Sequence, residues 1–114
     1  MMRGKVVLVP FPFDDLRATK VRPAVCLTDP IGTHRHVIMA FISSRTPADL
    51  LETDLILNSG QADFAMTGLR VTSTLRLHRL MTVTTALVRR ELGELSPRMQ
   101  DEVANLLRKL FGLA

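Results

Sequence analysis

Arg76 and His78 stand two residues apart in Leu69–His78, a segment of alternating apolar and polar residues. In an extended strand this spacing puts both side chains on one face. Arginine offers a permanent charge in a fork that fits phosphate, and histidine titrates near neutrality. Together they could move a proton and stabilise the charge that develops when RNA is cleaved by its own 2′-hydroxyl. The alternative is an ordinary solvent-exposed strand face.

Other catalytic and metal-binding chemistries find little support in the sequence. His34 and His36 lie close together, but zinc sites combine two tight Cys/His pairs, and that spacing is lacking. Cys26 lies in an apolar run, as a small core residue would. Asp14 and Asp15 open a polar loop, where paired acids are usually only solvated. We therefore expect no metal site and no cofactor.

The distribution of charge indicates a polyanionic partner. The chain has 15 Lys and Arg against 11 Asp and Glu, a net charge of +4. Between residues 61 and 90 the only acid is Asp63, whereas five arginines fall there: Arg70, Arg76, Arg79, Arg89 and Arg90. This local excess favours a phosphate-facing surface. A net charge of +4 is also compatible with ordinary solubility.

Length and composition predict one domain over residues 1–114. A single cysteine rules out an intramolecular disulfide and fits a reducing compartment. No apolar stretch approaches the length of a membrane span. We expect a cytoplasmic protein without a membrane partner.

Apolar and alternating runs predict a mainly β fold with a C-terminal helix. The expected strands are Lys5–Phe11, Pro23–Thr28, His36–Ser43, Asp54–Leu57, Leu69–His78, Leu80–Val83 and Val88–Leu92. Pro10 and Pro12 should end the pairing of the first strand, because proline donates no backbone hydrogen bond. Six or seven short strands and one helix suggest a small, strongly bent antiparallel barrel.

The helix has clear end signals. Ser96 is a good N-cap, Pro97 suits the first helical position, and Gly112 can adopt the left-handed C-cap conformation. Apolar residues recur at helical spacing: Met99, Val103, Leu106, Leu107 and Leu110. We expect this face to pack on the barrel.

The supply of apolar residues predicts a homodimer. After the barrel and helix are filled, Phe11, Phe13, Met39 and Phe41 are left over as a patch that a symmetric partner would bury.

Short motifs recur along the chain in a characteristic order. They are Arg3-Gly4-Lys5-Val6, Arg22-Pro23-Ala24-Val25, Phe41-Ile42-Ser43-Ser44, Thr67-Gly68-Leu69, Ser73 and Thr82-Val83, followed by the terminal helix. In order and spacing, over essentially the whole chain, they resemble the toxins of the MazF/PemK family.

The resemblance implies an SH3-like barrel that dimerises and cleaves single-stranded RNA, such as mRNA, without a metal. Family cleavage typically leaves a 2′,3′-cyclic phosphate. Such a chain is the toxin of a type II toxin–antitoxin pair and is silenced by a cognate antitoxin. Two alternatives remain on the same fold: a degenerate member that binds RNA or antitoxin without cutting, and a binder of a protein target such as DNA gyrase.

The resemblance also assigns site residues. Arg22 matches the family's catalytic arginine before proline, and Ser43 stands where the family has a catalytic threonine or serine. Arg76 aligns with a second arginine of some members, and His78 replaces their aspartate as a proton carrier. From residue type alone, Arg22 could equally be exposed without a role, and Ser43 could only cap a turn.

The RNA-binding residues we predict are Arg17 and Lys20, in the loop that borders the RNA groove in the family, with Arg70 and Arg79 from the basic stretch. This loop departs from the best-known members, so no recognition sequence carries over. With no Trp or Tyr and five Phe, base stacking should be limited.

Overall fold

The computed structural model describes residues 1–12 and 19–113, with the backbone only of Phe11, Pro12 and Thr19. The six strands of this part are β1 (Lys5–Pro12), β2 (Thr19–Cys26), β3 (His36–Ser43), β4 (Asp54–Leu57), β5 (Ser73–Thr84) and β6 (Arg90–Glu94). Two short 3₁₀ helices, η1 (Phe64–Thr67) and η2 (Thr85–Leu87), and the helix α1 (Pro97–Leu110) complete it. Arg17, one of the predicted RNA-binding residues, lies outside the described residues, as do Phe13, Asp14 and Asp15.

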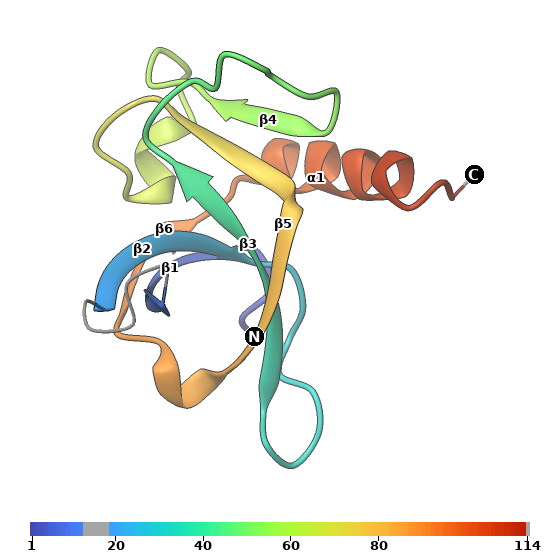
Figure 1. The fold of residues 1–114 in the computed structure, drawn as a ribbon. Coiled ribbons are helices and arrows are strands. Elements are labelled where there is room, and N and C mark those ends of the chain that lie inside the picture. The colour runs from blue at the N-terminus through green and yellow to red at the C-terminus, as the bar shows by residue number, and fades with distance from the viewer. Residues whose placement is uncertain (13–18, 114) are drawn as a thin grey trace.

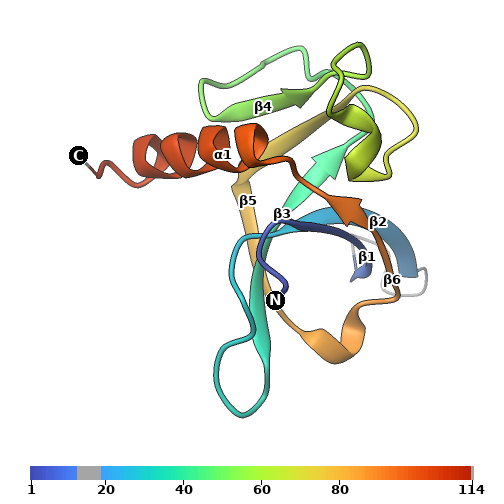
Figure 2. The ribbon, with the colours of Figure 1, turned by 180° about the vertical axis from the view of Figure 1, so that it is seen from behind.

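The strands form one antiparallel sheet in the order β4-β5-β3-β2-β1-β6. The sheet curls into a half-barrel, and α1 lies across one side of it, next to β4 (Figures 1 and 2). The predicted mainly β fold with a C-terminal helix is confirmed. In the described part of the chain, no helix is long and apolar enough to cross a membrane.

Apolar side chains cover both faces of the sheet. One cluster lies under α1 and includes Val6, Leu75, Leu77 and Met99. The other fills the hollow of the curl: Val7, Val9, Ala24, Cys26, Val37, Met39 and Val83. Met39, predicted to be left over for a dimer interface, is fully buried within the single chain, and Phe41 packs against the same cluster. The prediction that Met39 is left over for a dimer interface was wrong. The sheet buries side chains on both of its faces, so it holds more apolar residues than a barrel that is filled only on the inside.

Cys26 is a core residue, as expected. Its thiol is fully buried in the second cluster, and this burial raises its pKa to about 11. A protonated, inaccessible thiol is a poor nucleophile at neutral pH.

The prolines of β1 do not end its pairing. The ladder with β2 continues through Pro10, opposite Val21, to Pro12, opposite Thr19. On its other edge β1 pairs with β6 only from Lys5 to Leu8. Beyond Leu8, β1 therefore pairs, among the described strands, with β2 alone. Proline is tolerated there, because the free edge of the strand needs no backbone N–H donor.

The segment predicted as two strands around residue 79 is the single strand β5, and it begins at Ser73, not at Leu69. Ala40 pairs with Leu80, but the next residue, Phe41, pairs with Arg76. Residues 77–79 therefore form a bulge in β5. Val71, an apolar residue of the segment predicted as a strand, is exposed.

The helix begins and ends as predicted. The Ser96 side chain accepts a hydrogen bond from the Met99 backbone N–H at 3.1 Å, Pro97 is the first helical residue, and Gly112 has a φ of 68°. Met99 and Val103 are buried against the sheet.

Candidate nucleic-acid interface

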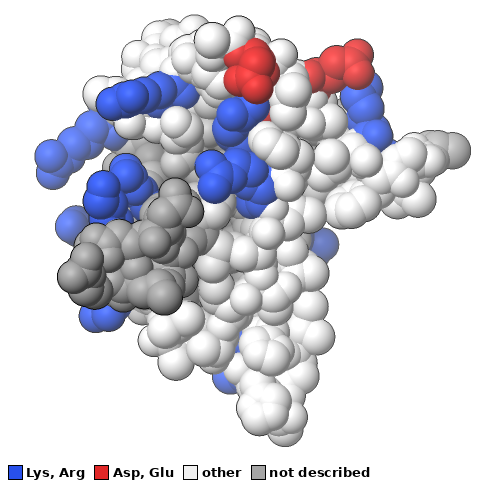
Figure 3. Space-filling model, in the orientation of Figure 1, with Lys and Arg blue, Asp and Glu red and all other residues white. Residues whose placement is uncertain are grey.

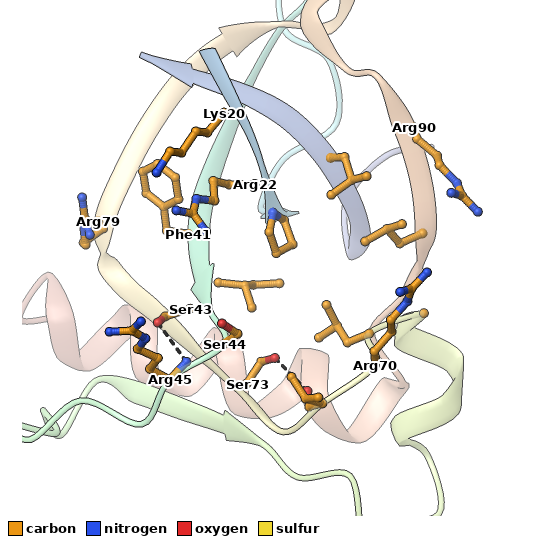
Figure 4. Close-up of a pocket in the computed structure, with 17 residues that line it drawn as sticks. Lys20, Arg22, Phe41, Ser43, Ser44, Arg45, Arg70, Ser73, Arg79 and Arg90 are labelled. Carbon is orange, nitrogen blue, oxygen red and sulfur yellow. Dashed lines mark hydrogen bonds between the residues drawn. The ribbon is translucent and has the colours of Figure 1, made fainter. Parts of the chain in front are cut away.

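An open groove of about 1020 Å³ lies where β2 begins and β3 ends, across from β6 and the segment after η1 (Figure 4). Its lining residues are Leu8, Lys20, Arg22, Pro23, Phe41, Ile42, Ser43, Ser44, Arg45, Gly68, Leu69, Arg70, Val71, Ser73, Arg79, Arg90 and Leu92. Four of the residues predicted from the sequence meet here across about fifty positions of chain: Lys20, Arg22, Ser43 and Arg70. Arg79 is the fifth.

The groove is strongly basic. Six of its described lining residues are cations and none is an acid: Lys20, Arg22, Arg45, Arg70, Arg79 and Arg90. Within the described part of the chain, none of the six forms an ion pair; the ion pairs found there belong to Lys5, Arg76 and Arg98. Figure 3 shows the basic side chains gathered on one half of this face, with the few visible acids at its upper margin. Because no described residue neutralises them, these cations favour an anionic ligand.

The β2–β3 ladder brings Arg22 and Ser43 to the same end of the sheet. Its last pair is Ala24 with Phe41. Arg22 lies two residues before Ala24, and Ser43 two residues after Phe41. Because side chains alternate along a strand, both continue the face on which Ala24 and Phe41 lie, and both line the groove.

The Ser43 hydroxyl both caps a turn and faces the groove. Its Oγ accepts a hydrogen bond of 3.2 Å from the Arg45 backbone N–H. This bond uses an oxygen lone pair and leaves the hydroxyl hydrogen available to donate. The two interpretations of Ser43 from the sequence are therefore compatible, since the cap fixes the oxygen beside the groove.

The opposite wall depends on a close backbone approach. A Cβ on Gly68 would lie 2.0 Å from the Leu92 carbonyl oxygen, and one on Gly93 would lie 2.1 Å from the Met66 carbonyl oxygen. Gly68 also has a φ of 72°. Only glycine fits both positions. This contact holds the segment after η1 against β6 and places Arg70 and Arg90 across the groove from Arg22 (Figure 4).

Arg76 does not line the groove. Its guanidinium donates two hydrogen bonds of 3.2 Å to Asp54 on the neighbouring strand β4. The Asp54 side chain is fully buried, and its Oδ2 also accepts the Leu51 backbone N–H at 2.8 Å. These contacts favour a structural role in holding β5, β4 and the segment before β4 together.

His78 is exposed in the β5 bulge and is also absent from the groove lining. The predicted catalytic set is thus divided: Arg22 and Ser43 share the groove, whereas Arg76 and His78 lie elsewhere. The catalytic roles of all four stay predictions. Among the described groove residues, none is a histidine or a carboxylate that could transfer a proton near neutral pH.

Several groove residues were missed from the sequence: Phe41, Ser44, Arg45, Ser73 and Arg90. Arg90 lies within the basic stretch that the sequence did single out, and Arg45 follows the Ser43-Ser44 motif directly. These signals were available for both. The described residues contain no group of three or more His, Cys, Asp or Glu able to hold a metal ion.

A family model described as "PemK-like, MazF-like toxin of type II toxin-antitoxin system" matches residues 2–111. A comparison with curated proteins finds no match.

Solved structures share the fold. The Mycobacterium tuberculosis toxin MazF-mt6 is 20% identical, with a TM-score of 0.73 over 96% of this chain and 98% of its own. A mycobacterial endoribonuclease in complex with its cognate antitoxin is 18% identical, with a TM-score of 0.69 over 100% and 97%. The MazE–MazF structure from Deinococcus radiodurans is 16% identical, with a TM-score of 0.70 over 100% and 98%.

Proposed function

Because the chain belongs to the PemK-like, MazF-like toxins of type II toxin–antitoxin systems, we propose that its basic groove binds single-stranded RNA and cleaves it without a metal. The observation behind this proposal is the set of six cations, which form no ion pair within the described part of the chain and have no acidic neighbour in the described lining. A mycobacterial protein with this fold is named as an endoribonuclease, which supports RNA cleavage as the activity of this chain.

In this proposal the 2′-hydroxyl of the RNA attacks the adjacent phosphorus, and the 5′-oxygen of the next nucleotide leaves. The products are a 2′,3′-cyclic phosphate and a 5′-hydroxyl, after one proton leaves the 2′-oxygen and one reaches the 5′-oxygen. Arg22 stabilises the extra negative charge of the pentavalent phosphate. The Ser43 hydroxyl, held by Arg45, donates a hydrogen bond to a phosphate oxygen.

Arg76 has a different part in this proposal. It acts as a positioning residue, because its bonds to Asp54 anchor the segment that runs from Ser43 and Arg45 to β4. The prediction that His78 carries the proton stands without support from the groove lining.

Cleavage of a long single-stranded RNA in excess EDTA tests the reaction. We expect cutting to continue, and sequencing of the fragment ends should show 5′-hydroxyls at a preferred sequence. Cutting that stops in EDTA and returns with magnesium or zinc would contradict the metal-free mechanism. Tight RNA binding without any cutting would favour the degenerate, non-catalytic alternative. That alternative fits the described groove lining, which contains no histidine or carboxylate to transfer a proton.

We further propose that a cognate antitoxin silences the protein by covering the groove. A groove with six cations suits an acidic segment that folds on binding. Expression of the chain alone should arrest growth, and coexpression of the antitoxin should restore it. Harmless expression of folded, RNA-cutting protein would contradict the toxin role.

A further inference from the structure

The groove contains one aromatic side chain among its described lining residues, and an arginine lies on it. The guanidinium carbon of Arg79 is 4.9 Å from the centroid of the Phe41 ring. Both residues line the groove, beside Lys20 and Arg22 (Figure 4). At this distance a cation over a ring face is attracted by the ring quadrupole. Phe41 therefore restrains the Arg79 side chain.

The contact between Arg79 and Phe41 lies at the β5 bulge. Phe41 pairs with Arg76 and Ala40 with Leu80, so residues 77–79 have no partners on β3. Leu77 turns into the core under α1, whereas Arg79 is exposed at the groove. Bulges re-aim side chains in this way next to functional sites. Counted on from the pair of Leu80 with Ala40, Arg79 is the residue next to Phe41; counted on from the pair of Arg76 with Phe41, it would lie opposite Ile38.

The chemistry of the pair differs from that of the other groove cations. Lys20 and Arg22 have no aromatic partner in the described part of the chain and suit phosphate oxygens. The guanidinium of Arg79 is planar and exposed, so it offers a stacking surface. Unstacked bases of single-stranded RNA bind arginine planes and aromatic rings in this manner.

We propose that Arg79, held by Phe41, forms a nucleobase subsite, on which the base next to the Arg22-bound phosphate stacks. This inference rests on the proposed function, because it requires RNA in the same groove. It adds a stacking contact to a base, where the sequence predicted that base stacking is limited, and it assigns Phe41 a positioning role.

Arg79→Lys tests the subsite, because it keeps the charge and removes the planar surface. Arg89→Lys is the matched control, since Arg89 is exposed near the groove but does not line it. Phe41→Leu removes the ring and keeps an apolar side chain, with thermal unfolding as a check that it folds. The probe is a short RNA around the strongest cut, or the tightest-bound sequence of a random pool, with 2′-O-methyl ribose at the cut to block cleavage.

Dissociation constants are measured for this RNA with one base at a time replaced by an abasic nucleotide. For the wild type and Arg89→Lys, we expect one position whose loss weakens binding about tenfold. In Arg79→Lys and Phe41→Leu, the same abasic replacement should change the dissociation constant less than twofold.

An unchanged tenfold loss in Arg79→Lys would overturn the subsite and leave RNA binding intact. Binding that depends on no base at all would do the same. Failure of the wild type to bind any of these RNAs would overturn the proposed function, and the subsite with it.

Discussion

Arg76 and Asp54 form a two-pronged ion pair, with both hydrogen bonds at 3.2 Å, around a carboxylate that is fully buried. The pair joins β5 to β4 and lies outside the basic groove. Removing one partner of such a pair leaves a buried charge without compensation.

Arg76→Ala should therefore lower the free energy of unfolding by about 3 kcal/mol, as measured by urea denaturation. Asp54→Asn keeps an acceptor for the Leu51 N–H and removes the charge. The double variant Arg76→Ala/Asp54→Asn should then be more stable than Arg76→Ala alone. If Arg76→Ala keeps wild-type stability and loses cleavage, Arg76 is catalytic as the sequence first suggested.

Arg22→Ala should cut RNA about a hundredfold more slowly or worse, because one preorganised cation at the developing charge is lost. Arg22 is exposed and makes no ion pair in the described part of the chain, so the variant should unfold at the wild-type temperature. Arg89→Ala removes an equal charge outside the groove and serves as the control. Equal rates for the two variants would show that Arg22 contributes only general electrostatic attraction.

His78→Ala tests the sequence-based prediction that His78 carries the proton. Because His78 is exposed and does not line the groove, we expect its removal to leave the cleavage rate and its pH dependence unchanged. The measurement is the cleavage rate between about pH 5 and 9. A limb of the pH profile that is present in the wild type and absent in His78→Ala would restore His78 as the proton carrier.

Asp63 makes the fold sensitive to acid. Hydrogen bonds from Arg98 and Ser96 lower the pKa of its carboxyl from 3.8 to about 2. A carboxyl that is more acidic in the folded state stabilises the protein above about pH 4, and this contribution is lost as the pH falls toward 2. The thermal midpoint of Asp63→Asn should therefore decline less than that of the wild type across this range. Asp101→Asn, on the exposed face of α1, should follow the wild type; if Asp63→Asn does so too, the contact adds nothing to stability.

We expect a homodimer in solution, and the structure offers a reason other than the one that the sequence suggested. Apolar side chains are exposed at neighbouring elements, on or beside β4 and at the end of α1: Leu50, Leu51, Ile56, Phe111 and Leu113. A symmetric partner could bury this surface. Light scattering at micromolar concentration should give twice the 12.7 kDa of one chain. Ile56→Lys, exposed on β4, should shift the mass toward one chain; a wild-type monomer that still cuts RNA would contradict the dimer.

The sequence by itself determined the bounds of those helices and strands that start and stop at local signals. The bounds of β3 and β4 were predicted as observed, and Ser96, Pro97 and Gly112 marked α1 because capping is a property of a few adjacent residues. The family motifs likewise placed Arg22 and Ser43, which do meet in one groove.

Only the tertiary structure decided which polar residues of β5 face the groove. Alternation predicts a face only along an unbroken ladder, and the bulge at residues 77–79 interrupts this one. Its position is set by the pairing of β5 with β3 and β4, which are distant in sequence. That pairing buries Arg76 against Asp54 and sets Arg79 on Phe41, and neither partner can be read from spacing within β5. The close approach of Gly68 and Gly93, which brings Arg70 and Arg90 across from Arg22, is a long-range contact of the same kind.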